Sequence, residues 1–219
     1  MKIDKFRLGI ILAVVCLGIL VSSFFLPWWT IEYKEKSPNV DARTVHDFSF
    51  SGIHTVNRFE VLETQHEDRR ETAYSDISGS DLDTHFFNLL LAVAVGIILI
   101  VLFLISHCLS GRKKILRLVG LILGFAVIFV VLSSAVYFYL YVPYEVGNSH
   151  DDLNISLDAE LPVIDTMAGS NKTILSQTIK ETVWGPSFGW HSTFAICIIM
   201  ISSIALIESP LGKEGKEED

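Results

Sequence analysis

Four long uncharged runs alternate with polar segments along this chain of 219 residues. The runs contain no Asp, Glu, Lys or Arg, and they cover residues 8–26, 88–107, 118–142 and 188–207. A helix needs about 20 mainly apolar residues to cross the hydrocarbon core of a bilayer. Each run is close to that length, so the pattern predicts four transmembrane helices.

Proline marks the ends of these runs. Pro27, Pro143 and Pro210 follow the first, third and fourth runs, as expected of a residue that does not continue a helix. Gly185-Pro186 precedes the fourth run, where it predicts a tight turn that leads into the last helix.

The two longer polar segments, 27–87 and 143–187, alternate in places between apolar and polar residues. Alternation of this kind, with many β-branched and aromatic residues, is typical of strands. It predicts strands at 29–34, 48–51, 59–64, 154–158, 173–175 and 178–183, with turns at Pro38-Asn39, Gly52 and 78–80. We therefore expect a membrane α-helical fold: a four-transmembrane-helix bundle with a small antiparallel β-rich extracytoplasmic domain formed by both outer loops.

The composition agrees with a membrane protein. Half of the residues (50%) are hydrophobic, 19% are charged, and the mean hydropathy is +0.45. This is too apolar for an ordinary soluble domain. The first run is longer than the about 7–15 apolar residues of a secretory signal and ends without an Ala-x-Ala site, so we expect it to remain as a helix.

Basic residues predict the orientation. Segment 1–7 contains three Lys or Arg and the link 108–117 contains four, whereas segment 143–187 contains two. Because short segments rich in Lys and Arg stay on the cytoplasmic side, we expect 1–7, 108–117 and 208–219 there. Segments 27–87 and 143–187 would then be outer loops of a multi-pass plasma-membrane protein.

Two glycosylation sequons occur in the second outer loop, Asn154-Ile-Ser and Asn171-Lys-Thr. Sequons are used outside the cytoplasm, so their position agrees with the predicted orientation. Asn154 and Asn171 are therefore the candidate glycosylation sites.

Aromatic residues gather at the outer ends of the first and fourth runs. They are Trp28, Trp29, Trp184, Phe188 and Trp190. Indole rings favour the headgroup layer of a membrane, so we interpret this set as an aromatic belt. A pocket lined by these rings between the outer domain and the bundle, and a catalytic loop, are the alternatives.

The motifs of common catalytic and metal sites are missing from the sequence. The runs hold no Asp, Glu, Lys or Arg, which counts against a transporter or an intramembrane enzyme. There is no paired-Cys or His-Glu-x-x-His signature. The cysteines, Cys16, Cys108 and Cys197, lie outside the outer loops, and Cys108 is either a palmitoylation site or a buried thiol. We expect no enzyme activity, catalytic residue, cofactor or metal.

Small residues recur at a spacing of four within the runs, at Ala92 and Gly96 and at Gly120 and Gly124. Such pairs let helix backbones approach closely in lipid. They predict close helix packing, either inside the bundle or between copies of the chain.

The order of these segments resembles the organisation of claudin-type four-span (tetraspan) proteins. The shared features are four spans, two inner termini and a large first outer loop that begins with Trp28 or Trp29; the Gly-Leu-Trp motif and the loop cysteine pair of that family are absent. The runs LPWWT and GPSFGW also resemble segments of small prokaryotic four-span membrane proteins. Both resemblances imply a multi-pass membrane protein.

We therefore expect a non-enzymatic integral membrane protein whose extracytoplasmic domain mediates protein or cell-surface interaction. The alternative is a small-molecule or ion handling protein that uses a groove between the outer sheet and the helix bundle. The expected partners are the lipid bilayer and a protein partner or a second copy of the chain, with no nucleic acid. The first outer loop has six basic and twelve acidic residues, which suits basic partners or simply a solvated surface.

Overall fold

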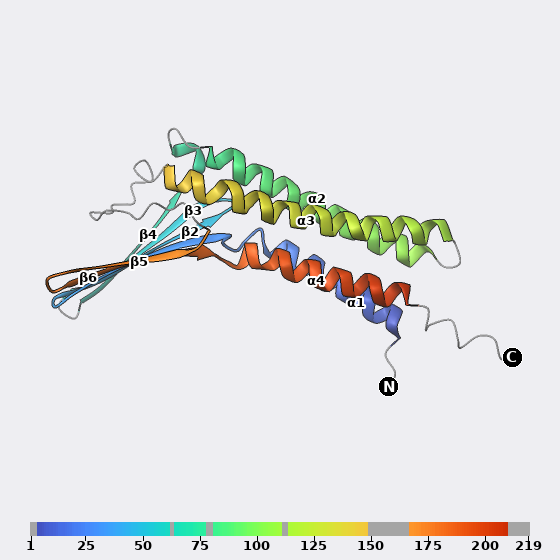
Figure 1. Ribbon diagram of the computed structural model, residues 1–219, viewed down its shortest axis with the longest axis horizontal. Helices are drawn as coiled ribbons and strands as arrows, with labels where there is room; N and C mark the ends of the chain where they lie inside the picture. The colour runs from blue at the N-terminus through green and yellow to red at the C-terminus, as the bar shows by residue number, and fades with distance from the viewer. Residues whose placement is uncertain (1–3, 62–63, 78–80, 111–113, 149–166, 210–219) are drawn as a thin grey trace. The chain divides into compact units, whose positions relative to one another are not determined.

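The computed structural model describes residues 4–61, 64–77, 81–110, 114–148 and 167–209. These residues form four α-helices, six strands and one short 3₁₀ helix, η1 (Tyr74–Asp76) (Figure 1). The helices are α1 (Lys5–Ser22), α2 (Leu82–Ser110), α3 (Lys114–Asn148) and α4 (Phe188–Glu208). The strands are β1 (Trp29–Ser37), β2 (Val40–Ser49), β3 (Gly52–Val61), β4 (Thr64–Thr72), β5 (Gly169–Leu175) and β6 (Thr178–Pro186).

The chain divides into two compact units. The helical unit comprises residues 1–22, 91–135 and 192–219, and the sheet unit comprises residues 23–90 and 136–191. Helices α2, α3 and α4 contribute residues to both units.

All four helices are long and apolar enough to cross a membrane, as the uncharged runs predict. In the helical unit α1 packs on α4, where the Ser203 hydroxyl donates to the Gly9 carbonyl over 2.7 Å. Helix α3 is joined to α4 by the ion pair of Arg117 with Glu208 at 2.8 Å. A hydrogen bond between small residues and an ion pair between charged ones thus join α4 to α1 and to α3.

The glycines of the predicted packing pairs lie at helix contacts inside this unit. A Cβ atom on Gly96 would stand 3.0 Å from the Leu20 side chain, on α1. One on Gly120 would stand 2.5 Å from the His107 ring, on α2, and one on Gly124 would stand 2.8 Å from Ile204, on α4. These three glycines therefore serve packing within the bundle, and Ala92 is partly exposed.

Helix α3 continues beyond its predicted end at Pro143. Phe138, Val142 and Val146 recur every four residues and are fully buried in the sheet unit. Their burial favours a continued helix because it removes apolar surface from water, and this outweighs the hydrogen bond that proline cannot make.

The strands form one six-stranded antiparallel sheet in the order β4-β3-β2-β1-β6-β5. Strands β1 to β4 come from the first polar segment and β5 and β6 from the second, and β1 pairs with β6 to join them. This confirms that both polar segments share an antiparallel sheet. The turn between β2 and β3 uses Gly52 at a φ of 142°, a conformation that favours glycine.

The predicted turn at Gly185-Pro186 is wrong. Strand β6 continues through Trp184 to Pro186, and Gly185 lies opposite Thr30 of β1. The pairing continues past the strand ends, because Ser187 N–H donates to the Trp28 carbonyl over 2.9 Å. Backbone pairing with β1 thus holds this segment extended until α4 begins at Phe188.

Other predicted strands differ in their ends. The residues at 48–51 span the end of β2 and its turn, and those at 59–64 span the end of β3 and the start of β4. The predicted strand at 154–158 and the predicted turn at 78–80 lie outside the described residues. Residues 29–34, 173–175 and 178–183 do lie within strands.

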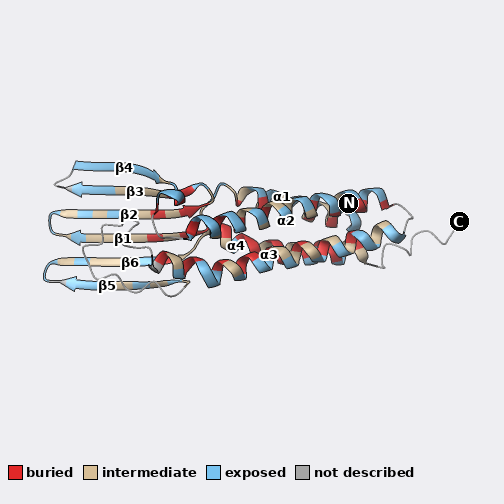
Figure 2. Cartoon of the chain, turned by 90° about the horizontal axis from the view of Figure 1, so that it is seen from above, coloured by how far each residue is buried: buried red, intermediate tan, exposed pale blue. Residues whose placement is uncertain are grey.

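Aromatic rings form the core of the sheet unit. Contacts with ring centroids 4.5–6.3 Å apart join Phe24, Trp28, Phe50, Tyr74, Phe86 and Phe138. In Figure 2 the buried positions of β1 and β2 gather at one end of each strand, where Trp29 and Phe48 lie. The other end of the sheet is partly to fully exposed, so its side chains reach solvent.

Candidate interaction surface

Strand alternation sorts the side chains of the sheet onto two faces, and one of them carries most of the charge. We call it the charged face and define it by Glu32, Lys34, Arg43, Arg58, Glu67 and Arg69. The pairing register places one charged residue from each strand in a single row. From β5 to β4 this row is Lys172, Glu181, Lys34, Arg43, Arg58 and Glu67.

Two carboxylates of the charged face are each shared by two cations. Glu32 pairs with Lys34 at 3.2 Å and also with the Nε of Arg43. Glu67 pairs with Arg69 at 2.6 Å and with Arg58 at 3.0 Å. Hydrogen bonds from Arg69 and then from Arg58 hold the pKa of the Glu67 carboxyl below its ordinary value. In these two groups four cations share two carboxylates.

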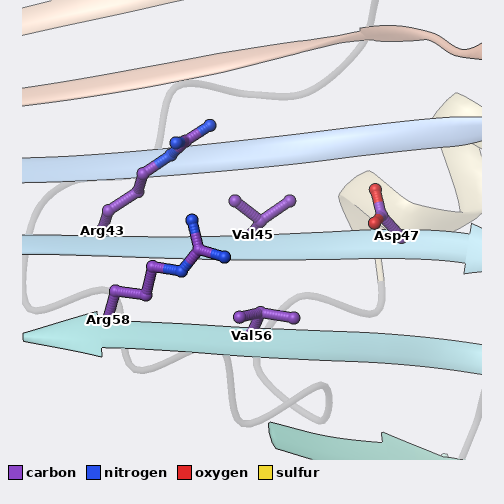
Figure 3. Close-up of a pocket in the computed structure, with 5 residues that line it drawn as sticks. All are labelled: Arg43, Val45, Asp47, Val56 and Arg58. Carbon is purple, nitrogen blue, oxygen red and sulfur yellow. The ribbon is translucent and has the colours of Figure 1, made fainter. Parts of the chain in front are cut away.

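A hollow of about 170 Å³ lies on the charged face and is lined by Arg43, Val45, Asp47, Val56 and Arg58. Figure 3 shows both arginine side chains extending over the sheet from neighbouring strands, with the two valines next to them. Asp47 accepts a hydrogen bond from the Thr30 hydroxyl over 2.8 Å. Arg43 also lines two larger hollows, of about 400 Å³ and 450 Å³, so it is a shared wall of all three.

The opposite face of the sheet is buried at the end where Trp29 and Phe48 lie, and it carries a buried histidine. His46 lies opposite Ile31 and Thr55, and its Nδ1 is 2.9 Å from the Thr55 hydroxyl. Burial lowers the pKa of His46 to about 4, so the ring is neutral at pH 7. Since it is only 6% exposed, this histidine serves the packing of the domain.

The predicted aromatic belt divides into buried and exposed members. Trp28 and Trp29 are fully buried and Trp184 is 7% exposed, so these rings pack in the protein core and have almost no surface to offer to lipid. The indole N–H of Trp29 donates to the Met167 carbonyl over 2.9 Å. Phe188 is 45% exposed and Trp190 is partly exposed, and for these two a belt stays a prediction.

Two glycines make room for the buried rings. A Cβ atom on Gly189 would overlap the ring of Trp28, and one on Gly169 would overlap the ring of Trp184. The glycine in the Phe188-Gly189-Trp190 stretch is therefore required by a tryptophan that precedes it by more than one hundred residues. Nothing in the local sequence indicates that contact.

The other predicted positions lie apart from the charged face. Asn171 is partly exposed in β5, on the opposite face, and Asn154 lies outside the described residues. Cys16 and Cys197 are buried, and Cys108 is exposed near the end of α2. Within the part of the chain that the structure describes, no group of three or more His, Cys, Asp or Glu is placed to hold a metal ion.

Sequence reasoning did not single out Arg43 or Arg58. The stretch 40–47 shows an alternation of charged and smaller residues, but no aromatic or strongly apolar pattern, so it was not predicted as a strand. Without the register of β2 against β3, the two arginines are simply fifteen residues apart. Comparison with protein-family models and with curated proteins found no match to the chain.

Proposed function

We propose that the chain is a non-enzymatic integral membrane protein that crosses the bilayer four times and binds a protein partner through the charged face of its sheet. The termini would be cytoplasmic and the sheet unit extracytoplasmic, as the distribution of Lys and Arg predicts. The observation that carries this proposal is the charged face itself.

The surface of the helical unit supports placement in lipid. Large apolar side chains there are strongly exposed, among them Phe129 at 73%, Ile198 at 66% and Ile122 at 59%. Exposed apolar surface of this extent is unfavourable in water and suits a hydrocarbon environment. The helices therefore have both the length and the surface of membrane spans.

The charged face supports protein binding. Arginine is enriched at protein interfaces, where its planar guanidinium group donates several hydrogen bonds at once. Arg43 and Arg58 are each about half exposed, and adjoining hollows give the surface relief that a partner's side chains can enter. The resemblance to four-span proteins with a large outer loop agrees with such a role.

Site-specific photocross-linking in native membranes tests the proposal. A photoreactive amino acid would replace Lys36, an exposed residue on the side of the charged face, or Arg70, an exposed residue on the opposite face. We expect a discrete protein adduct from position 36 and none from position 70, identified by mass spectrometry. Adducts from position 70 alone, or no protein adduct from either position, would contradict the proposal.

A further inference from the structure

Three cations lie side by side across neighbouring strands of the charged face. Lys34 of β1 is directly opposite Arg43 of β2, which is directly opposite Arg58 of β3. Like charges at opposite positions destabilise a sheet. Residues that oppose folding locally are expected at functional positions. This row of cations is therefore a candidate ligand-binding site.

Two carboxylates lie at ion-pair distance from these three cations, and each is shared. Glu32 is shared between Lys34 and Arg43. Glu67 is shared between Arg58 and Arg69. In the row, Lys34 lies opposite Glu181 and Arg58 lies opposite Glu67, whereas Arg43 has a cation opposite it on both neighbouring strands. Positive charge is thus concentrated around Arg43, which favours an anionic group there.

Arg43 and Arg58 keep hydrogen-bond donors with which they can bind an anionic group. Arg43 and Arg58 each use the Nε in their ion pairs with Glu32 and Glu67. Among the described residues, no hydrogen bond engages the Nη atoms of either arginine. Guanidinium groups bind a carboxylate with two parallel N–H···O bonds, and such charge-assisted bonds are stronger than neutral ones.

The size and floor of the hollow indicate what kind of anion fits. Its volume of about 170 Å³ is below the about 300–1,000 Å³ typical of sites for whole small molecules. Val45 and Val56 line it beside the guanidinium groups, so methylene groups attached to the anion can lie on apolar surface. Asp47 lines the same hollow and repels an anion, which leaves the arginine end for the carboxylate.

We infer that the Arg43–Arg58 pair receives the carboxylate of a single Asp or Glu side chain from the protein partner. This rests on the proposed function and names the chemistry of the partner at one position. The methylenes of the acidic residue contact Val45 and Val56, and its two oxygens accept hydrogen bonds from the Nη atoms.

A defined peptide tests the site without the natural partner. The full chain in phosphatidylcholine nanodiscs would be titrated into fluorescein-labelled hexaglutamate at low salt, with fluorescence anisotropy as the readout. Arg43→Gln and Arg58→Gln should each weaken binding about tenfold, because each removes one charge-assisted pair of bonds. Rising salt should weaken the parent's binding as well, because ions screen exposed charges.

Arg70→Gln is the matched control, since Arg70 is exposed, paired with an acidic residue and placed on the opposite face. It should bind hexaglutamate like the parent, and hexaglutamine should bind none of the proteins. Glu32 and Glu67 each keep one cation in the test variants, so thermal melts should remain near the parent's. Equal binding by Arg43→Gln, Arg70→Gln and the parent would overturn the inference, as would binding only to vesicles that contain phosphatidylserine.

The outcomes separate this inference from the proposed function. If the cross-link from position 36 persists in the Arg43→Gln/Arg58→Gln double variant with unchanged yield, the inference fails and the protein-binding face remains. If the peptide binds as expected but no partner is ever cross-linked, the carboxylate site remains and protein binding as the physiological role fails.

Discussion

Single residues in the sheet unit show how burial decides chemistry. His46 and Tyr74 are both buried, at 6% and 5% exposure, and the side chain of each is hydrogen-bonded within the sheet unit. The Tyr74 hydroxyl donates to the Ser49 carbonyl over 2.7 Å, and burial raises the pKa of that phenol well above its ordinary value. For His46 burial lowers the pKa, because the charged form of an imidazole loses its hydration.

The buried His46 predicts acid-sensitive stability of the sheet unit. Its pKa is about 4 in the folded protein, and about 6.5 in an unfolded chain. Below pH 6.5 the unfolded state takes up a proton that the folded state resists, so the free energy of unfolding falls as pH falls. The full loss, reached below pH 4, is about 3 kcal/mol.

Denaturant unfolding followed by tryptophan fluorescence at pH 7 and pH 4.5 measures this loss. His46→Gln should remove most of the difference between the two pH values, because glutamine does not titrate. The control is His66→Gln at an exposed position of β4, which should keep the parent's difference. A pH dependence that survives His46→Gln would assign the effect to other groups.

At the scale of the elements, small residues decide which helices touch. Gly120 and Gly124 of α3 each lie where a side chain on α2 or α4 fills the space. Gly18 of α1 shows the contrast, since a Cβ atom added there would meet no atom within 4 Å. Glycine is therefore a packing requirement at some helix positions and not at others, although all lie in apolar runs.

We expect Gly120→Leu to destabilise the helical unit while Gly18→Leu does not. The leucine at position 120 would displace the His107 ring, which lies 2.5 Å from the Cβ position. Overpacking of this kind costs about 1–3 kcal/mol. Melting temperatures of both variants in the same detergent provide the comparison. Equal melting of the two variants would show that α3 does not pack on α2 through Gly120.

At the scale of the whole molecule, the two units expose different surfaces. The helical unit exposes large apolar side chains such as Phe129 and Ile198, whereas the strands of the sheet unit expose charged side chains such as Arg69 and Glu71. Apolar surface favours hydrocarbon and charged surface favours water. The helices and the strands thus suit different media, which is the physical basis of the proposed placement of the helices in a membrane.

The proposed orientation predicts the labelling of single cysteines on intact cells. In a background without Cys16, Cys108 and Cys197, a cysteine at Gln65 or Ser170 should react with a membrane-impermeant maleimide. One at Gly111 should react only after permeabilisation, since the basic link is expected inside. The converse pattern, with labelling at 111 and none at 65 or 170, would reverse the orientation.

Local pattern determined the class of α1 to α4, β1 and β6 in this protein. The four uncharged runs correspond to α1 to α4, and the alternating stretches at 29–34 and 178–183 lie within β1 and β6. A run of apolar residues or a period-two alternation is a property of neighbouring residues. Such a pattern does not depend on which distant residues meet, so the sequence alone is enough to predict the helix or strand that it forms.

The tertiary structure alone decided which distant residues meet. Pairing of β1 with β6 kept Gly185-Pro186 extended, and burial of Trp28 required Gly189. The register between β2 and β3 placed Arg43 opposite Arg58 and so created the hollow between them. A shift of one residue would send these side chains to opposite faces, and that register depends on the packing of the whole sheet, which the local sequence pattern does not contain.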